Sequence, residues 1–154
     1  MIMIVVLTFV IGVVAGLRAM TPLAAVSWGA RLGHVPLEGT HLSWLGGTVA
    51  PWIFTVLAIG EIINDKLPAT PSRKIPPQFI TRVVTGAFSG AAIGVSQDVL
   101  ALGLVAGALG AVAGTLGGAA VRGKLAAAFG KDLPAALLED VVAIGLAVAV
   151  VSQL

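Results

Sequence analysis

Residues 99–121 read VLALGLVAGALGAVAGTLGGAAV and contain no charged side chain. An α-helix needs about 20 consecutive apolar residues to cross the hydrocarbon core of a bilayer. Four other stretches of the chain approach that length and composition. The sequence therefore predicts transmembrane helices over about residues 1–20, 43–67, 76–96, 99–121 and 133–154.

The overall composition agrees with a bilayer environment. Among the 154 residues, 58% are hydrophobic and 10% are charged, whereas soluble domains carry about 25% charged residues. So few charges cannot form the polar shell that a soluble domain of this size needs. We therefore expect an all-α, polytopic membrane helix bundle, forming one domain over residues 1–154 with the lipid bilayer as its main partner.

A shorter helix is predicted after the first one. Thr21 followed by Pro22 is typical of a helix start, because proline at the first helical position has a suitable φ and needs no hydrogen-bond acceptor. The resulting helix, over about 22–32, is too short to cross a bilayer and is predicted to be interfacial or re-entrant. Prolines separate the second and third long helices, at Pro68, Pro71, Pro76 and Pro77.

Glycines recur every four residues on the third and fourth long helices. These glycines are Gly86, Gly90 and Gly94, then Gly110, Gly114 and Gly118. Residues four apart share one helix face, so each series forms a groove in which another helix backbone can approach closely. We expect tight helix packing within a subunit or between the subunits of a homo-oligomer. The alternative is a sliding or gating surface.

The distribution of Lys and Arg predicts the orientation. Seven of these residues lie near the segments that join helices two to three and four to five, whereas only Arg18 and Arg31 lie on the other side. Cytoplasmic loops carry the excess of positive charge. This rule places the N-terminus in the cytoplasm and the C-terminus outside.

Charges inside the predicted helices fall at one depth. Glu61, Arg82 and Glu139 each lie six residues from a predicted cytoplasmic helix end, which is about 9 Å along a helix. Asp65 shares the face of Glu61, and Asp140 points about 100° away from Glu139, so only one of that pair is expected to face inward.

Such charges are costly in a membrane and face water or one another. Carboxylates outnumber the nearby bases, even with Arg122 included, which favours a cytoplasm-facing polar chamber that binds an ion, a proton or a polar solute. The alternative is an internal salt-bridge network around Arg82 that only orients helices.

Arg18 ends the first apolar helix just before the Thr21-Pro22 break. Interrupted helices often mark transporter substrate sites, where a helix N-terminus attracts an anion. The simpler interpretation is that Arg18 extends to the outer headgroups. The candidate substrate-binding or ion-binding residues are therefore Glu61, Asp65, Arg82, Glu139, Asp140, Arg18, Thr21 and Arg122.

Several functions have no support in the sequence. The chain has no cysteine, which excludes thiolate metal sites and thiol nucleophiles. No basic cluster alternates with aromatic residues, so no nucleic-acid partner is expected. No nucleophile pair is evident, no cofactor is expected, and a role other than catalysis is favoured. Whether the carboxylates hold a metal is left open.

Three blocks of sequence resemble one family. They are GLRAMTPLAAV at residues 16–26, Glu61 with DKLP at 65–68 and TPSR at 70–73, and LLED at 137–140. They look like the signature of the small bacterial membrane proteins grouped as domain of unknown function 4126, over nearly the whole chain. The resemblance implies a location in the bacterial inner membrane and no particular activity.

Three functions compete at this point. The first is a small transporter or channel-like protein that uses the carboxylates and Arg82 or Arg18. The second is an intramembrane enzyme that acts on lipid-linked substrates with a divalent metal on the carboxylates. The third is a non-catalytic scaffold. A water-accessible cavity at the charges favours the first, a bound divalent ion the second, and a dry, fully paired cluster the third.

Overall fold

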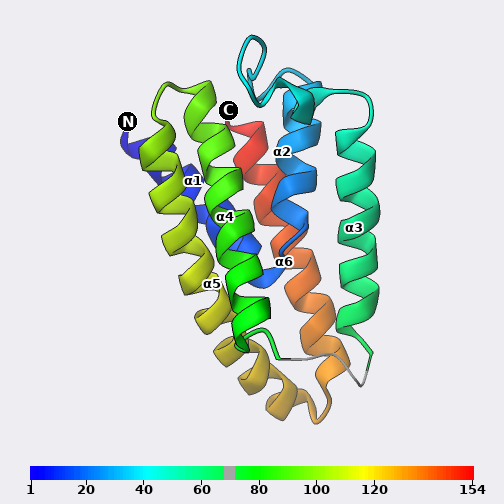
Figure 1. Ribbon diagram of the computed structural model, residues 1–154. Helices are drawn as coiled ribbons and strands as arrows, with labels where there is room; N and C mark the ends of the chain where they lie inside the picture. Colours follow the sequence, from blue (N-terminus) through cyan, green and yellow to red (C-terminus); the bar gives the residue numbers. More distant parts are fainter. Residues whose placement is uncertain (68–71) are drawn as a thin grey trace.

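The computed structural model describes residues 1–67 and 72–154. All regular elements in these two ranges are helical, which confirms the predicted all-α class (Figure 1). They are α1 (Ile2–Leu17), α2 (Thr21–Arg31), the 3₁₀ helix η1 (Ser43–Gly46), α3 (Ala50–Asp65), α4 (Pro76–Ser96), α5 (Leu100–Phe129) and α6 (Asp132–Ser152).

Three of the described helices, α4, α5 and α6, are long and apolar enough to cross a bilayer, and α1 is a shorter apolar helix. Large apolar side chains point outward from the bundle, for example Val56 on α3, Val84 on α4 and Val141 on α6. An outward apolar surface is stable in lipid and unstable in water. The protein is therefore a multi-pass membrane protein, although the predicted count of five spans is not confirmed.

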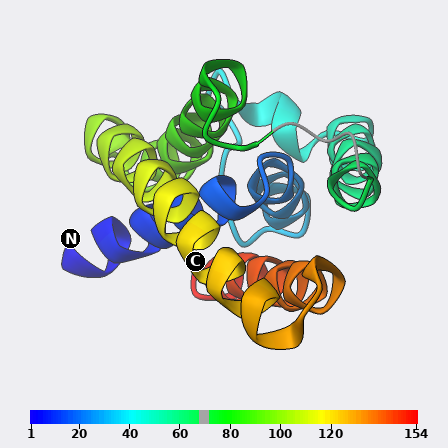
Figure 2. The same ribbon diagram turned by 90° about the horizontal axis from the view of Figure 1, so that it is seen from below.

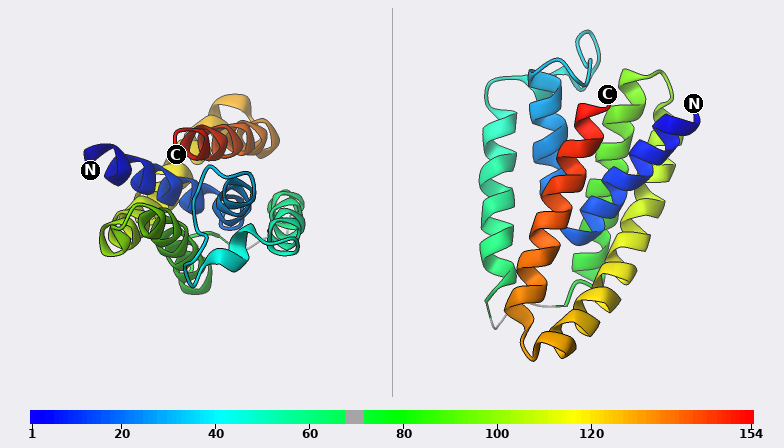
Figure 3. Two further views of the ribbon diagram at one scale, coloured as in Figure 1. Left: turned by 90° about the horizontal axis from the view of Figure 1, so that it is seen from above. Right: turned by 180° about the vertical axis from the view of Figure 1, so that it is seen from behind.

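The first two helices form a broken pair. α1 runs obliquely into the bundle and ends partway along it, and α2 then runs back toward the end at which the chain began (Figures 1 and 3). The N-terminus and the C-terminus consequently lie at the same end of the bundle. Five complete spans would instead place the two termini at opposite ends of the bundle, and α1 differs from a complete span because it ends partway along it.

Some predicted helix limits differ from the observed ones. The helix predicted over 99–121 continues to Phe129, because the first strong breaker is Gly130, with a left-handed φ of 75°. The first helix stops at Leu17 rather than near residue 20, and the helix predicted over 43–67 is divided into η1 and α3. Pro68 and Pro71, which were expected to end that helix, lie outside the described residues.

The repeated glycines join helices of one chain. A Cβ atom added at Gly90 would lie 2.2 Å from the carbonyl oxygen of Gly103, and one at Gly110 would lie 2.0 Å from that of Phe9. These distances leave no room for a side chain between α4 and α5 or between α5 and α1. The glycine faces predicted to join the subunits of a homo-oligomer are therefore occupied within the subunit.

Candidate functional site

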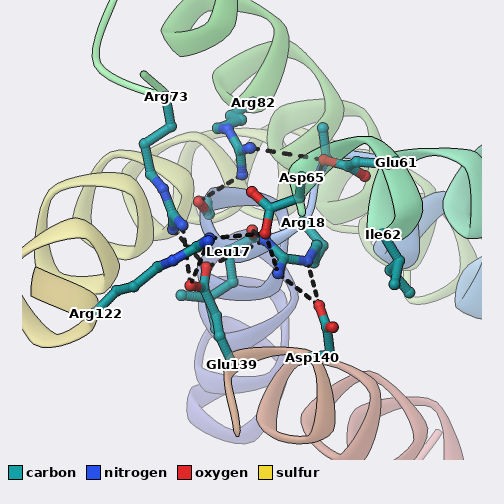
Figure 4. A network of polar contacts seen from close by, with 12 residues as sticks. Leu17, Arg18, Glu61, Ile62, Asp65, Arg73, Arg82, Arg122, Glu139 and Asp140 are labelled. Carbon is teal, nitrogen blue, oxygen red and sulfur yellow. Dashed lines mark hydrogen bonds and ion pairs between the residues drawn. The ribbon is translucent and has the colours of Figure 1, made fainter. Parts of the chain in front are cut away.

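The end of α1 carries a fully buried arginine. Arg18 follows directly after α1 and has 0% of its surface exposed. Its Nε donates to Asp140 Oδ1 at 2.7 Å, and its Nη2 donates to Asp65 Oδ2 at 2.9 Å. Its Nη1 lies 3.4 Å from Glu139 Oε1. Arg18 thus joins α1 to α3 and α6 at the centre of the charged cluster (Figure 4).

A second arginine ties the same acids to α5. Arg122 Nη1 donates to Asp65 Oδ2 at 2.8 Å and lies 3.5 Å from Glu139 Oε2. Its Nε and Nη2 bind the carboxylate of Asp132 in a bidentate pair, at 3.0 and 2.6 Å. Because Asp132 is the first residue of α6, this pair also fixes the turn between α5 and α6.

The two adjacent acids of α6 each have their own cation. Arg73, which precedes α4, places its Nη1 and Nη2 at 2.6 and 2.9 Å from the two Glu139 oxygens. Lys66, just after α3, pairs with Asp140 Oδ2. Both acids are buried, at 9% and 7% exposure. The prediction that only one of them faces inward was wrong, because Arg18 lies between them and binds both.

Glu61 occupies the break between α1 and α2. Its two carboxylate oxygens accept hydrogen bonds from the backbone N–H groups of Ala19 and Met20, at 2.7 and 2.8 Å. On the other side of the break, Arg82 Nη1 donates to the carbonyl oxygen of Gly16 at 2.9 Å. A helix N-terminus favours an anion and a helix C-terminus favours a cation. Glu61 and Arg82 therefore stabilise both ends of the broken pair.

The cluster is balanced in charge. The described ion pairs join five cations to five carboxylates, namely Arg18, Lys66, Arg73, Arg82 and Arg122 with Glu61, Asp65, Asp132, Glu139 and Asp140. The expectation that carboxylates outnumber bases was wrong, because tertiary contacts bring in cations that lie far away in sequence. We call these ten residues the ion-pair network.

Seven of the eight predicted site residues belong to this network. The exception is Thr21, which starts α2 beside the break and is 7% exposed. Arg18 does not extend to headgroups, as one interpretation held. Sequence reasoning missed Lys66, Arg73 and Asp132, because the two bases were counted only for orientation and no sequence pattern placed Asp132 near the other charges.

A polar cavity lies against the network. Its volume is about 540 Å³, and it opens between the C-terminal end of α3, the start of α4, the C-terminal third of α5 and the start of α6. Its charged lining consists of Glu61, Asp65, Lys66, Arg73, Arg82, Arg122 and Asp132. Buried charges that line a cavity can be solvated, so this wall of the network is accessible to polar ligands.

A second cavity is apolar and borders the network at Arg122 and Glu139. It has a volume of about 330 Å³ and is lined by α1, α5 and α6, including Leu17, Gly117 and Val142. Arg122 and Glu139 line this groove as well, and Arg122 also lines the polar cavity.

Metal coordination would require several of these acids to converge on one point. In the two described ranges, no three His, Asp or Glu side chains are grouped closely enough to hold a metal ion. Each network carboxylate instead faces a guanidinium or an ammonium group.

These features define a class of protein: a multi-pass membrane helix bundle with a broken helix pair and a buried ion-pair network at the break. The sequence profile of the family described as domain of unknown function (DUF4126) matches residues 5–153, so the chain belongs to this family. No curated protein and no solved structure matches the chain.

Proposed function

We propose that this protein is a small membrane transporter for a polar solute, which enters the polar cavity and meets the ion-pair network at the α1–α2 break. The cavity of about 540 Å³, lined by the network, is the observation that carries the proposal. Pockets of about 300–1,000 Å³ hold small molecules. A network that served only to hold helices together would need no such space beside it.

The helix break supports the proposal. Discontinuous helices commonly form transporter binding sites, because the half-helix ends offer partial charges and free backbone groups inside the membrane. Here the N–H groups of Ala19 and Met20 are held by Glu61 rather than by the helix backbone. Arg82 Nε is buried and has no hydrogen-bond partner among the described residues, so a donor is left for a group from outside the chain.

The lining of the cavity indicates the class of solute. Guanidinium and carboxylate groups both line it, and Arg122 pairs with both Asp65 and Asp132. A solute with both charges can exchange with such pairs without leaving a buried charge unpaired. We therefore propose a small zwitterion, such as glycine, as the solute class.

The orientation follows from the same charges. Basic residues gather at the end of the bundle where the α5–α6 turn lies, away from both termini (Figure 1). By the positive-inside rule this end, with the mouth of the cavity, faces the cytoplasm of the bacterial inner membrane. Both termini then lie outside, in place of the predicted cytoplasmic N-terminus, and α1 with α2 forms a re-entrant pair.

The test is solute entry into liposomes that contain the purified protein. Vesicles are mixed with an osmotic excess of glycine, acetate, methylammonium or glycerol, and swelling is followed by light scattering. We expect protein-dependent, saturable entry of glycine. Ala119→Trp, which fills the cavity lining, should reduce that entry to the rate of empty liposomes, whereas Gly117→Trp in the apolar groove should not.

Equal swelling rates for all four solutes with and without protein would overturn the transport proposal. Entry of glycine that is unchanged in Ala119→Trp would overturn the assignment of the cavity. Size-exclusion profiles of both variants serve as the control for folding.

A non-catalytic scaffold is the second candidate, and the ion pair that each network residue makes with an opposite charge supports it. Five cations and five carboxylates can hold α1, α3, α5 and α6 together without any ligand. Under this alternative no solute crosses the membrane, and disruption of the network affects only stability. The liposome experiment separates the two candidates.

A further inference from the structure

Hydroxyl side chains on the helices fall into two groups. In most of them the hydroxyl donates to a carbonyl oxygen three or four residues earlier in the same helix, which is the usual solution inside a membrane. This group consists of Thr8, Thr55, Thr81, Thr85, Ser96, Thr115 and Ser152.

Three buried hydroxyls depart from this rule. Ser27 and Ser89 are both 0% exposed and Thr21 is 7% exposed, yet none has a hydrogen-bond partner in the described part of the chain. A buried polar group without a partner is destabilising, and in most structures it is bound by protein or by ordered water. The three oxygens therefore indicate a partner outside the described part of the chain.

Ser27 and Ser89 lie at the same height above the ion-pair network. α2 and α4 run in the same direction from the level of Glu61, which binds Met20 N–H and lies 3.7 Å from Arg82 (Figure 1). Ser27 is six residues beyond Thr21 and Ser89 is seven beyond Arg82. At 1.5 Å per residue both are about 10 Å farther along their helices.

The helix faces also agree. On α2, Trp28 contacts Thr55 of α3 and Gly29 contacts Val151 of α6. Because successive residues turn by about 100°, Ser27 is on the side of α2 away from α6, where both η1 and α4 pack against α2 (Figure 2). On α4, Ser89 lies within about 20° of Arg82, whose side chain reaches the α1–α2 break.

We propose that Ser27 and Ser89, with Thr21 closer to the network, form a buried site for a neutral hydrogen-bonding ligand between α2 and α4. The ligand is either water or an uncharged polar group of a solute, since hydroxyls donate and accept but carry no charge. This inference rests on the proposed function, because it identifies where a polar path continues beyond the network toward the opposite end of the bundle.

The experiment uses the absence of cysteine from the chain. Ser27→Cys and Ser89→Cys introduce single, nearly isosteric thiols, and Ala143→Cys provides an equally buried thiol in the apolar core. The purified variants react with 2-aminoethyl methanethiosulfonate, which modifies thiols that water can ionise. We expect both serine-site thiols to react at least about tenfold faster than the thiol at residue 143. Reaction of both at the control rate overturns the site.

Ser89→Ala gives an independent measurement. If the hydroxyl is dry and unpaired, its removal raises the melting temperature, which overturns the proposal. If the hydroxyl holds a ligand, the melting temperature is unchanged or falls, which supports it.

The thiol reaction is then repeated in a high concentration of free glycine, the proposed solute, to decide whether the site holds water or a group of the solute. Slower thiol reaction in its presence indicates that the solute reaches the site, and an unchanged fast reaction indicates water alone. Fast reaction together with no glycine entry into liposomes would remove the transport proposal and leave the site intact.

Discussion

Arg18 Nε donates to Asp140 Oδ1 at 2.7 Å, although the two residues are 122 positions apart and Arg18 has no exposed surface. This contact joins the end of α1 to α6. Around it, every network acid except Asp132 is at most partly exposed. The broken helix pair is therefore held in place by ionic contacts rather than by apolar packing alone.

Replacement of Arg18 is expected to destabilise the protein strongly. Arg18→Leu leaves Asp65 and Asp140 with one cation fewer, and loss of one partner from a buried pair costs about 3–5 kcal/mol. The matched control is Arg31→Leu, which replaces an exposed arginine whose Nη1 donates to the Gly47 carbonyl oxygen, with an expected change within about 0.5 kcal/mol. Thermal unfolding in detergent measures both, and similar losses would contradict the central position of Arg18.

Glu61 is expected to stabilise the α1–α2 break through both of its oxygens. Glu61→Ala leaves the N–H groups of Ala19 and Met20 without an acceptor, at a cost of about 1–3 kcal/mol for each buried group. Glu61→Gln keeps one acceptor and should lose less. Amide hydrogen exchange at Ala19 and Met20 should accelerate in the order wild type, Gln, Ala.

The control for this series is Glu38→Ala, an exposed acid outside the network. Unchanged exchange at both amides in Glu61→Ala would show that the break does not depend on this carboxylate.

The glycines are expected to matter for folding rather than for assembly. Gly90→Ala puts a methyl group 2.2 Å from the carbonyl oxygen of Gly103, so α4 and α5 must separate and the melting temperature should fall. Gly117 has open space around its Cβ position. Gly117→Ala should be neutral or stabilising, by up to about 1 kcal/mol, because alanine is the better helix former. Equal effects of the two changes would refute this use of the glycines.

The two termini are expected to lie on the same side of the membrane. A reporter that is active only in the cytoplasm should be inactive at both the N-terminus and the C-terminus, and active when inserted after Gly130, in the α5–α6 turn. Activity at only one terminus would contradict the fold itself. Activity at both termini and none after Gly130 would keep the fold and reverse the orientation.

The sequence by itself determined the solvent and the class of the protein. Uncharged stretches such as residues 99–121 require helices in lipid, since backbone groups have no other partners there. The same logic identified Glu61, Asp65, Arg82, Arg122, Glu139 and Asp140 as important, because ionisable groups in a membrane need partners. The four-residue spacing of the glycines indicated close helix packing, but not which helices would pack.

Only the tertiary structure decided which charged side chains form ion pairs with one another. Helical periodicity extends over a few residues, whereas Arg18 and Glu139 are brought together by the packing of α1 against α6. For the same reason the sequence left Arg18 open between a substrate site and the outer headgroups, and it predicted that the first helix is a complete span. A helix that ends in an arginine can stop inside the membrane when carboxylates of other helices lie at its end and pair with that arginine. Here α3 supplies Asp65, and α6 supplies Glu139 and Asp140.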